Sequence, residues 1–256
     1  MEQRDSFDTV ADLYAEVRRG YPAALYDDLT ALAGLGRDAS VLEVGCGGGQ
    51  ATGDLAARAR HVTALDPGAQ LVGQDRARIV APNVDFVVSR FETYDAPPAA
   101  FDLVASAQAW HWVDPAIAYA KAAGALTPGG CLALFGHVPL PPTGPLSAAF
   151  KAIYDRHLPG AWGTPPPQAA YRPGALFDVG IDASGLFGPV THREYAWTWR
   201  LDPQTFGRYL RTDSSYHVLP EARRFALFDD LAQAVADQGG MFDSPWETHL
   251  YVAARR

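Results

Sequence analysis

The chain has 256 residues, 48% of them hydrophobic, and carries a formal net charge of −8. This length predicts one domain with additions, and the acidic balance argues against a nucleic-acid partner. No apolar run is long enough to span a membrane, and the start MEQRDSFD is too polar for a secretory signal. Cys46 and Cys131 lack the spacing of metal or disulfide frameworks. We therefore expect a cytosolic protein that uses neither a membrane nor a metal.

Two helices are predicted at the start of the chain. Residues 6–18 place apolar side chains at helical spacing on one face, and Tyr14 lies on that face. Pro22 suits the first turn of a second helix that continues through Leu25, Leu29 and Leu32.

A glycine loop between a strand and a helix is the strongest signal in the sequence. The segment 41–59 reads VLEVGCGGGQATGDLAARA: an apolar strand, five residues dominated by glycine, and an apolar-periodic helix. Glycine lets the backbone approach a ligand closely, and the helix start supplies free N–H groups. A small polar ligand is therefore predicted at this loop.

The glycine spacing favours one class of cofactor over another. A dinucleotide fingerprint counted from Gly45 and Gly47 needs a third small residue, and Gln50 stands there. Glu43, two residues before the loop, would repel a pyrophosphate and favour a ligand with an amine. The run from Glu43 to Gly49 resembles the E/D-x-G-x-G-x-G loop of class I S-adenosylmethionine-dependent methyltransferases.

A carboxylate follows the next predicted strand. Residues 61–65 are apolar-rich and end in Asp66 and Pro67, about 20 residues past the glycines, which is the spacing of a ribose-binding acid. Nicotinamide enzymes place an acid at the same point, so Asp66 does not separate the two cofactors. Its alternative role is to cap the helix predicted over 69–80.

The resemblance assigns further cofactor contacts. FDTVADLYAEVRRGYP (7–22) is similar to an N-terminal element of small-molecule methyltransferases, which implies that Tyr14 and Arg18 lie over the methionine end of the cofactor; core packing is an equal alternative for Tyr14. After a third strand at 83–88, the resemblance implies an adenine-holding turn. Phe91 is expected to flank the adenine there, although Arg90 stands where the family often has an acid.

Strands continue to alternate with helices. Residues 101–107 and 131–135 form apolar strands, and between them a helix is predicted from Asp114 and Pro115 to the stop at residues 128–130. This alternation predicts an α/β, Rossmann-like, doubly wound sheet, in which ligands bind beyond the carboxyl ends of the strands. The glycine loop, Asp66, Phe91 and the exit at residues 108–112 all fall at that edge.

The second half of the chain predicts a cap and two more strands. From residue 138 prolines become frequent around one helix at 146–157, and we interpret residues 138–189 as a mostly helical cap inserted after a core at 1–137. Strands at 194–199 and 249–254, with helices at 202–212 and 220–238 between them, would complete seven strands within 190–256. The resemblance implies that the last strand lies antiparallel between the fifth and sixth.

The predicted function is methyl transfer to a small, apolar or aromatic metabolite. His111 is the candidate general base, because its ordinary pKa lies near neutrality; its alternative is a wall residue. The residues predicted to contact cofactor are Tyr14, Arg18, Glu43, Gly45, Gly47, Asp66, Pro67, Phe91 and Gln108. Those predicted to line the substrate pocket are Trp110, Trp112, Trp162, Tyr216 and His217.

Two other functions stay open at this point. The chain could bind S-adenosylmethionine without methylating, or catalyse a different reaction with it. It could also be a nicotinamide oxidoreductase, which Gln50 and Glu43 disfavour. The sequence names neither the acceptor, nor the methylated atom, nor the oligomeric state.

Overall fold

A computed structural model describes the chain except residues 1–12, 14–15, 165–166, 214 and 217–218. Most of the helix expected over 6–18 therefore lies outside the described residues, as do two of the predicted site residues, Tyr14 and His217. Among the residues that are described, no helix is long and apolar enough to cross a membrane.

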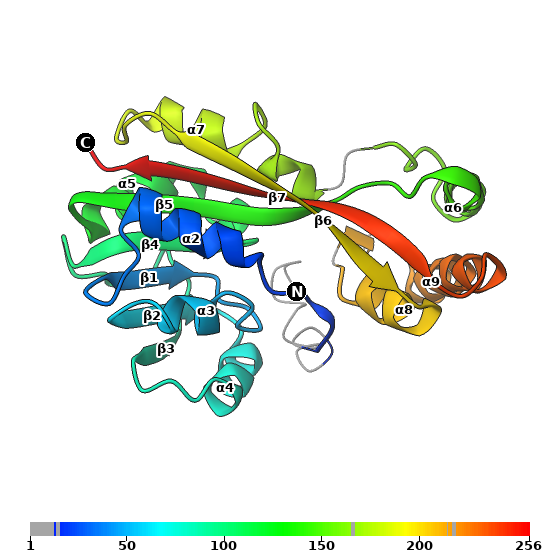
Figure 1. Ribbon diagram of the computed structural model, residues 1–256, viewed down its shortest axis with the longest axis horizontal. Helices are drawn as coiled ribbons and strands as arrows, with labels where there is room; N and C mark the ends of the chain where they lie inside the picture. Colours follow the sequence, from blue (N-terminus) through cyan, green and yellow to red (C-terminus); the bar gives the residue numbers. More distant parts are fainter. Residues whose placement is uncertain (1–12, 14–15, 165–166, 214, 217–218) are drawn as a thin grey trace.

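The centre of the molecule is a seven-stranded sheet in the order β3-β2-β1-β4-β5-β7-β6 (Figure 1). The strands are β1 Ser40–Val44, β2 His61–Asp66, β3 Val84–Val88, β4 Phe101–Ala107, β5 Leu126–Pro139, β6 Thr191–Leu201 and β7 Phe242–Ala254. All neighbouring pairs from β3 to β5 are parallel, and β7 is antiparallel to both β5 and β6. The predicted doubly wound fold and the place of the last strand are both confirmed.

Helices cover both faces of this sheet. They are α2 Ala23–Ala33, α3 Thr52–Ala56, α4 Ala69–Arg78, α5 Pro115–Ala125 and α7 Phe177–Ser184, with 3-10 turns η2 at Trp110–Trp112 and η3 at Pro167–Tyr171. Local chemistry sets their ends: α2 stops at Gly34, whose φ is 66°, and Asp114 accepts the Ala116 N–H at 2.9 Å where α5 begins. Each end satisfies backbone groups that a helix leaves without partners.

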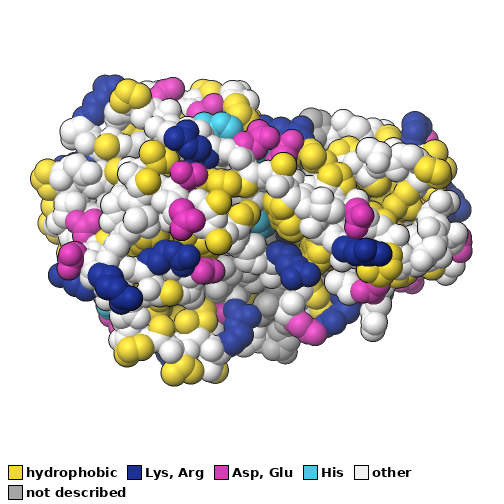
Figure 2. Space-filling view, in the orientation of Figure 1, with side chains coloured by type: hydrophobic (Ala, Val, Ile, Leu, Met, Phe, Trp, Pro, Cys, Tyr) yellow, Lys and Arg dark blue, Asp and Glu magenta, His cyan; other side chains and the backbone are white. Residues whose placement is uncertain are grey.

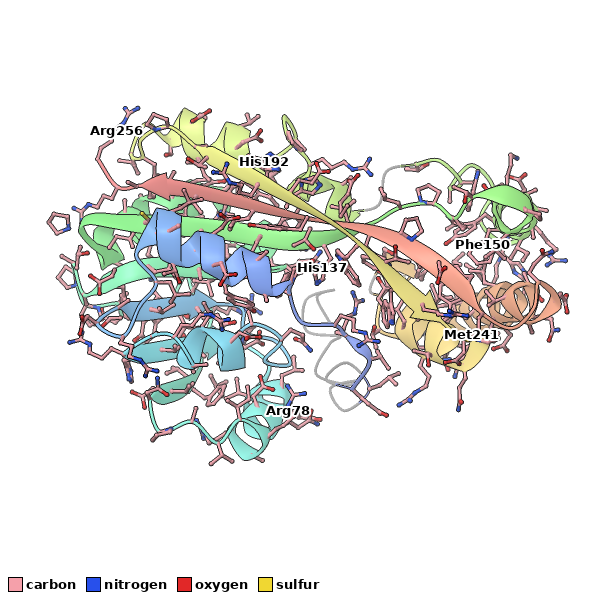
Figure 3. All side chains as sticks on the ribbon, in the orientation of Figure 1. Arg78, His137, Phe150, His192, Met241 and Arg256 are labelled. Atoms are coloured by element: carbon pink, nitrogen blue, oxygen red, sulfur yellow. The ribbon has the colours of Figure 1, made fainter. Side chains whose placement is uncertain are left out.

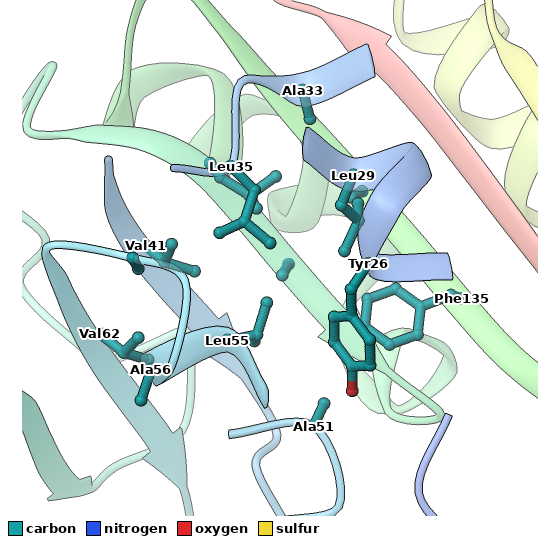
Figure 4. Packing of buried hydrophobic residues seen from close by; sticks show 14 of the residues in the cluster. Tyr26, Leu29, Ala33, Leu35, Val41, Ala51, Leu55, Ala56, Val62 and Phe135 are labelled. Atoms are coloured by element: carbon teal, nitrogen blue, oxygen red, sulfur yellow. The ribbon is translucent and has the colours of Figure 1, made fainter. Parts of the chain in front are cut away.

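The two faces form separate hydrophobic cores. On one, Tyr26 and Leu29 of α2 lie in the same core as Phe135 of β5 and Leu55 of α3 (Figure 4). On the other, α5 and α7 cover side chains such as Leu132 and Leu134 of β5. Because the middle of β5 is buried on both faces, residues 131–135 are continuously apolar rather than alternating.

The last two strands are longer than the sequence indicates. β6 and β7 pair from Thr191 with Val252 to Leu201 with Phe242, whereas β5 reaches only to the pair of Pro139 with Trp246. The end of the β6–β7 ribbon therefore projects past the sheet. Pairing between β6 and β7 extends both strands past the residues whose sequence alternates. The sequence of a single strand does not reveal this pairing.

A helical lobe is built on this projecting ribbon. It contains α6 Gly144–His157, α8 Pro203–Arg211 and α9 Glu221–Asp237, which share a third core around Phe206, Phe228 and Trp246. Figure 1 shows the lobe at the opposite end of the molecule from β1, β2 and β3. The term lobe refers below to α6, α8 and α9 together with the projecting end of the β6–β7 ribbon.

The lobe differs from the cap expected over 138–189. Only α6 of that segment joins the lobe, whereas η3 and α7 return to the sheet, where Tyr171, Phe177 and Ile181 are fully buried in the second core. α8 and α9, from the final third of the chain, supply the rest. The segment divides because the apolar side chains of α6 pack in the third core, whereas those of η3 and α7 pack in the second core.

Candidate active site

A cavity of about 510 Å³ lies where the carboxyl ends of the strands face the lobe. Figure 3 places His137, one of its lining residues, where the sheet meets the β6–β7 ribbon. Nine residues predicted from the sequence also line it: Arg18, Gly45, Gly47, Asp66, Pro67, Phe91, Gln108, His111 and Trp112. The fold thus brings together side chains from segments up to about a hundred residues apart.

The glycine loop is tied to the strand beside it. The N–H groups of Gly45 and Cys46 both donate to the Leu65 carbonyl, at 2.8 and 2.9 Å. Gly45 has a φ of 75°, and a Cβ there would come 2.3 Å from the Cβ of Ala109. Only glycine fits both the conformation and the space.

Asp66 organises this loop and also faces the cavity. Its Oδ2 accepts the N–H of Gly47 at 2.9 Å, and its Oδ1 accepts the N–H of Gly68 at 2.8 Å. Asp66 does not cap α4, which begins after Gly68 without a side-chain cap hydrogen bond, so the alternative cap role is not found. Its carboxylate instead joins the glycine loop to the turn after β2, and it lines the cavity.

Glu43 lies behind the loop and is not a lining residue of the cavity. Its side chain is 1% exposed, and neither carboxyl oxygen makes a hydrogen bond with a described residue. Burial raises its pKa to about 8. Asp75 is a second buried carboxyl near the loop; burial raises its pKa to about 7 against the opposing effect of Arg78, which is 3.1 Å away. The buried acids near the loop are thus favoured in their protonated form.

The turn after β4 presents one tryptophan and one histidine to the cavity. Gln108 adopts a φ of 57°, and its side chain is fixed by the backbone of His137: Oε1 accepts its N–H at 2.6 Å and Nε2 donates to its carbonyl at 3.2 Å. Trp112 and His111 follow in η2 and line the cavity. Burial lowers the pKa of His111 to about 4, and its Nδ1 has no hydrogen-bond partner in the described structure.

Three predicted substrate residues lie elsewhere. Trp110 is 3% exposed and packs between Phe91 and Tyr119 in the second core, because the tight η2 turn directs it away from Trp112. Trp162 and Tyr216 both contact Tyr154 within the lobe, Trp162 by ring packing and Tyr216 by a hydroxyl–hydroxyl hydrogen bond. None of the three is among the lining residues of the cavity.

Aromatic residues that the sequence did not single out form the lobe side of the cavity. Trp197 and Trp246 stack with ring centroids 5.5 Å apart, and Trp199 meets Tyr209 edge to face at 5.4 Å. Together with two further rings, these residues form a wall that we call the aromatic side. Its members are Tyr21, His137, Trp197, Trp199, Tyr209 and Trp246. Its signal in the sequence is the alternation of Trp197 and Trp199, which places both indoles on one face of β6.

His137 is a neutral ring with a defined proton position. Trp197 Nε1 donates to Thr248 Oγ1 at 2.9 Å, which leaves the threonine hydroxyl proton for His137 Nδ1 at 2.7 Å. Nδ1 then accepts, and the ring proton resides on Nε2. Burial lowers the pKa of His137 to about 3, and the backbone of Gly20 and Arg19 near the ring opposes this shift.

Arg18 joins the N-terminal segment to the lobe. Its guanidinium donates to the hydroxyl and the carbonyl of Thr212, at 3.0 and 2.9 Å, and lies 4.6 Å above the Tyr209 ring. The predicted carboxylate partner thus holds one wall of the cavity against another.

Comparison with protein families identifies part of the chain. The methyltransferase domain family matches residues 42–134. An uncharacterized methyltransferase of Mycobacterium tuberculosis is 35% identical over 129 residues, which is 50% of this chain and 51% of that protein. Methyltransferase gedG of Aspergillus terreus is 31% identical over 135 residues, 50% of this chain and 42% of its own. The chain spans about half the length of the curated relatives it matches.

Solved structures extend the likeness to nearly the whole chain. A candidate type II methyltransferase from Anaeromyxobacter dehalogenans is 25% identical with a TM-score of 0.63, covering 93% of this chain and 97% of that one. The 4+2 cyclase SpnF, 17% identical, has a TM-score of 0.53 over 98% of this chain and 93% of its own. The second likeness concerns the fold alone.

Proposed function

We propose that the chain, whose residues 42–134 match the methyltransferase domain family, uses S-adenosylmethionine to methylate a small apolar or aromatic metabolite. The observation that carries the proposal is the composition of one cavity: Asp66 and the glycine loop form one side, and stacked indoles form the other. Deep sites for small ligands are lined mainly by such apolar and aromatic groups.

The residues of the cofactor side fit this cofactor. Asp66 presents a carboxylate to the cavity, a group to which ribose hydroxyls can donate, and Phe91 offers an apolar ring beside the space for adenine. Arg18 lies across the cavity, where a carboxylate can pair with a guanidinium. When bound, S-adenosylmethionine supplies an electrophilic methyl group on a sulfonium.

The protein's own contribution is to align the acceptor and exclude water. The indoles hold a flat acceptor, and alignment in a dry cavity can supply several kcal/mol of the rate enhancement, on the order of 5 or more. At neutral pH the His111 ring is neutral, so one nitrogen can accept a hydrogen bond from the acceptor's O–H or N–H. A ring of such low basicity orients the nucleophile better than it removes its proton.

Calorimetry with S-adenosylmethionine and S-adenosylhomocysteine tests the cofactor. Incubation with a labelled methyl donor and a host-cell extract, followed by mass spectrometry of labelled products, tests the reaction. We expect binding of both nucleosides and one labelled small molecule. Absence of binding would overturn the proposal at its first step.

A second candidate function is a reaction other than methylation in the same site. The likeness in fold to a 4+2 cyclase is the observation that favours it, because this fold is compatible with chemistry beyond methyl transfer. A chain of this kind would bind S-adenosylmethionine and never release S-adenosylhomocysteine with any acceptor. For the nicotinamide alternative, titration with reduced nicotinamide cofactor should show no saturable binding.

A further inference from the structure

The charged groups on the aromatic side are unequally engaged. Arg18 is held by Thr212, and Asp213 Oδ1 already accepts the N–H and hydroxyl of Ser215, at 3.0 and 2.7 Å. Arg19 lines the same cavity with its guanidinium 5.3 Å above the Trp199 ring, and it forms no ion pair or hydrogen bond with a described residue. Its charge is therefore available to a ligand.

The same arrangement disfavours a cationic ligand. An aromatic wall attracts cations through its ring faces, but guanidinium groups already lie over Tyr209 and Trp199. A ligand ammonium would meet two like charges there and one carboxylate, Asp213, whose Oδ1 is in use. Like charges that close repel appreciably at the dielectric of a partly buried site.

Hydrogen-bond chemistry favours the same sign of ligand charge. His137 Nδ1 accepts from the Thr248 hydroxyl and its buried Nε2 lies near the backbone of Gly20 and Arg19, so the ring offers a ligand ammonium no acceptor. Positive charge thus dominates one wall of a protein whose net charge is −8. Because the chain as a whole is acidic, this local excess of positive charge is specific to the cavity.

We propose that the methyl acceptor is a planar aromatic acid, whose ring lies against Trp197 and whose carboxylate pairs with the Arg19 guanidinium. This rests on the proposed methyl transfer and narrows its substrate class. The pair is partly exposed, so it sets a preference of about three- to tenfold rather than absolute selectivity.

A panel that changes charge at constant shape tests the proposal. The probes are benzoate, benzamide and benzylamine, with the naphthalene homologues 2-naphthoate, 2-naphthamide and 2-naphthylmethylamine. Binding is measured by calorimetry on protein saturated with S-adenosylhomocysteine. We expect each carboxylate to bind three- to tenfold tighter than its amide and each amine to bind weakest, with the gap narrowing as salt rises.

Two variants assign the preference to one residue. Arg19→Gln should make carboxylate and amide bind equally, and Arg19→Lys should restore part of the gap. Arg37→Gln removes an exposed arginine that is not a lining residue and should leave the gap unchanged. Circular dichroism checks that each variant is folded.

Three results would overturn the inference: no probe binds, the amines bind as well as the acids, or Arg19→Gln keeps the gap. Failure of the proposed function looks different, because S-adenosylhomocysteine itself would then not bind. In that case the panel is run on the protein alone, and the charge preference of the cavity is still measured.

Discussion

Asp66 holds the glycine loop and is also the proposed ribose ligand, which makes its substitution informative. Asp66→Ala removes the acceptor of the Gly47 and Gly68 N–H groups as well as the proposed ribose contact. Hydrogen bonds to a charged group contribute about 1.5–3 kcal/mol each, so we expect roughly tenfold to a hundredfold weaker S-adenosylmethionine binding and a lower Tm. Calorimetry and thermal melts measure the two effects.

The matched control for this prediction is Asp54→Ala. Asp54 forms a surface ion pair with Arg58 on α3, so its loss should change neither quantity appreciably. Equal affinity of wild type and Asp66→Ala would remove Asp66 from the binding site.

His111 is the second residue whose role can be decided by measurement. Since burial lowers its pKa to about 4, it stays neutral from about pH 6 to 8 and should add no ionisation to the rate profile in that range. We expect His111→Gln to raise KM for the acceptor and to lower turnover less than about tenfold. Steady-state kinetics across this pH range provide the test.

A different outcome would restore the general-base role. It would consist of a turnover loss of about 10²–10⁴-fold in His111→Gln, together with a wild-type rate that rises through an ionisation near pH 6.5. Unchanged S-adenosylhomocysteine affinity in the variant would locate the effect at the acceptor.

At the scale of elements, the glycine loop depends on its contact with the turn after β4. In Gly45→Ala the new Cβ overlaps Ala109 and the residue keeps a φ of 75°, so we expect unfolding to become easier by about 2–4 kcal/mol. Adding Ala109→Gly should restore the stability lost through the overlap of the two Cβ atoms. The stability lost through the positive φ of residue 45 should remain lost. Urea unfolding of the single and double variants separates the two.

Gly124→Ala is the control for this prediction. Gly124 lies in α5 with open space where its Cβ would be, and its φ is not positive, so alanine should stabilise the fold by about 0.5–1 kcal/mol. Equal destabilisation by Gly45→Ala and Gly124→Ala would contradict the close contact at the loop.

The glycine-loop side of the cavity could be predicted from the sequence because its signals are local. The strand, the glycines and Asp66 lie within one stretch of chain, and chain order fixes where a parallel strand ends. The aromatic side could not be predicted in this way. Trp246 faces Trp197 only because β7 is antiparallel to β6 in one register, and that register is a long-range property.

Neighbouring residues in a tight turn also resist prediction. Trp110 and Trp112 both adjoin His111 in the sequence, yet Trp110 lies in the second core and Trp112 lines the cavity. The direction of each side chain depends on the 3-10 geometry of η2 and on the strained backbone of Gln108, whose φ is 57°. A pattern of residue types contains no information about that geometry.

At the scale of the whole molecule, buried titratable groups give stability an unusual pH dependence. Glu43 and Asp75 have pKa values of about 8 and 7 in the fold, above their ordinary values of 4.5 and 3.8. Between the two sets of values the folded state binds more protons, so this contribution is complete at about pH 4 and is lost as the pH rises to about 8. His111 and His137, with lowered pKa values, act oppositely and cost stability as the pH falls below about 6.5.

Glu43→Gln isolates the alkaline side of this dependence. Glutamine keeps the shape without an ionisable proton, so the unfolding free energy of the variant relative to wild type should rise from about pH 5 to about pH 9, by up to about 1.4 kcal/mol per pH unit within the interval. Urea unfolding at the two pH values measures it. A difference that does not vary with pH would show that Glu43 is ionised in the fold.

The mixture of charges on the surface fits the proposed small acceptor. On the face drawn in Figure 2, lysine and arginine side chains alternate with acidic ones and do not gather into a basic field. A nucleic-acid substrate would need such a field to meet its phosphates.

The position of β7 between β5 and β6 has a consequence for synthesis on the ribosome. The strand that completes the sheet is the last one translated, so β5 keeps an open edge and β6 has no neighbour until residues 242–254 emerge. Open edges of this kind pair readily with other chains. A product terminated shortly before residue 242 would leave edges of both β5 and β6 unpaired. Protection of the nascent chain by chaperones therefore matters most between the synthesis of β6 and the synthesis of β7.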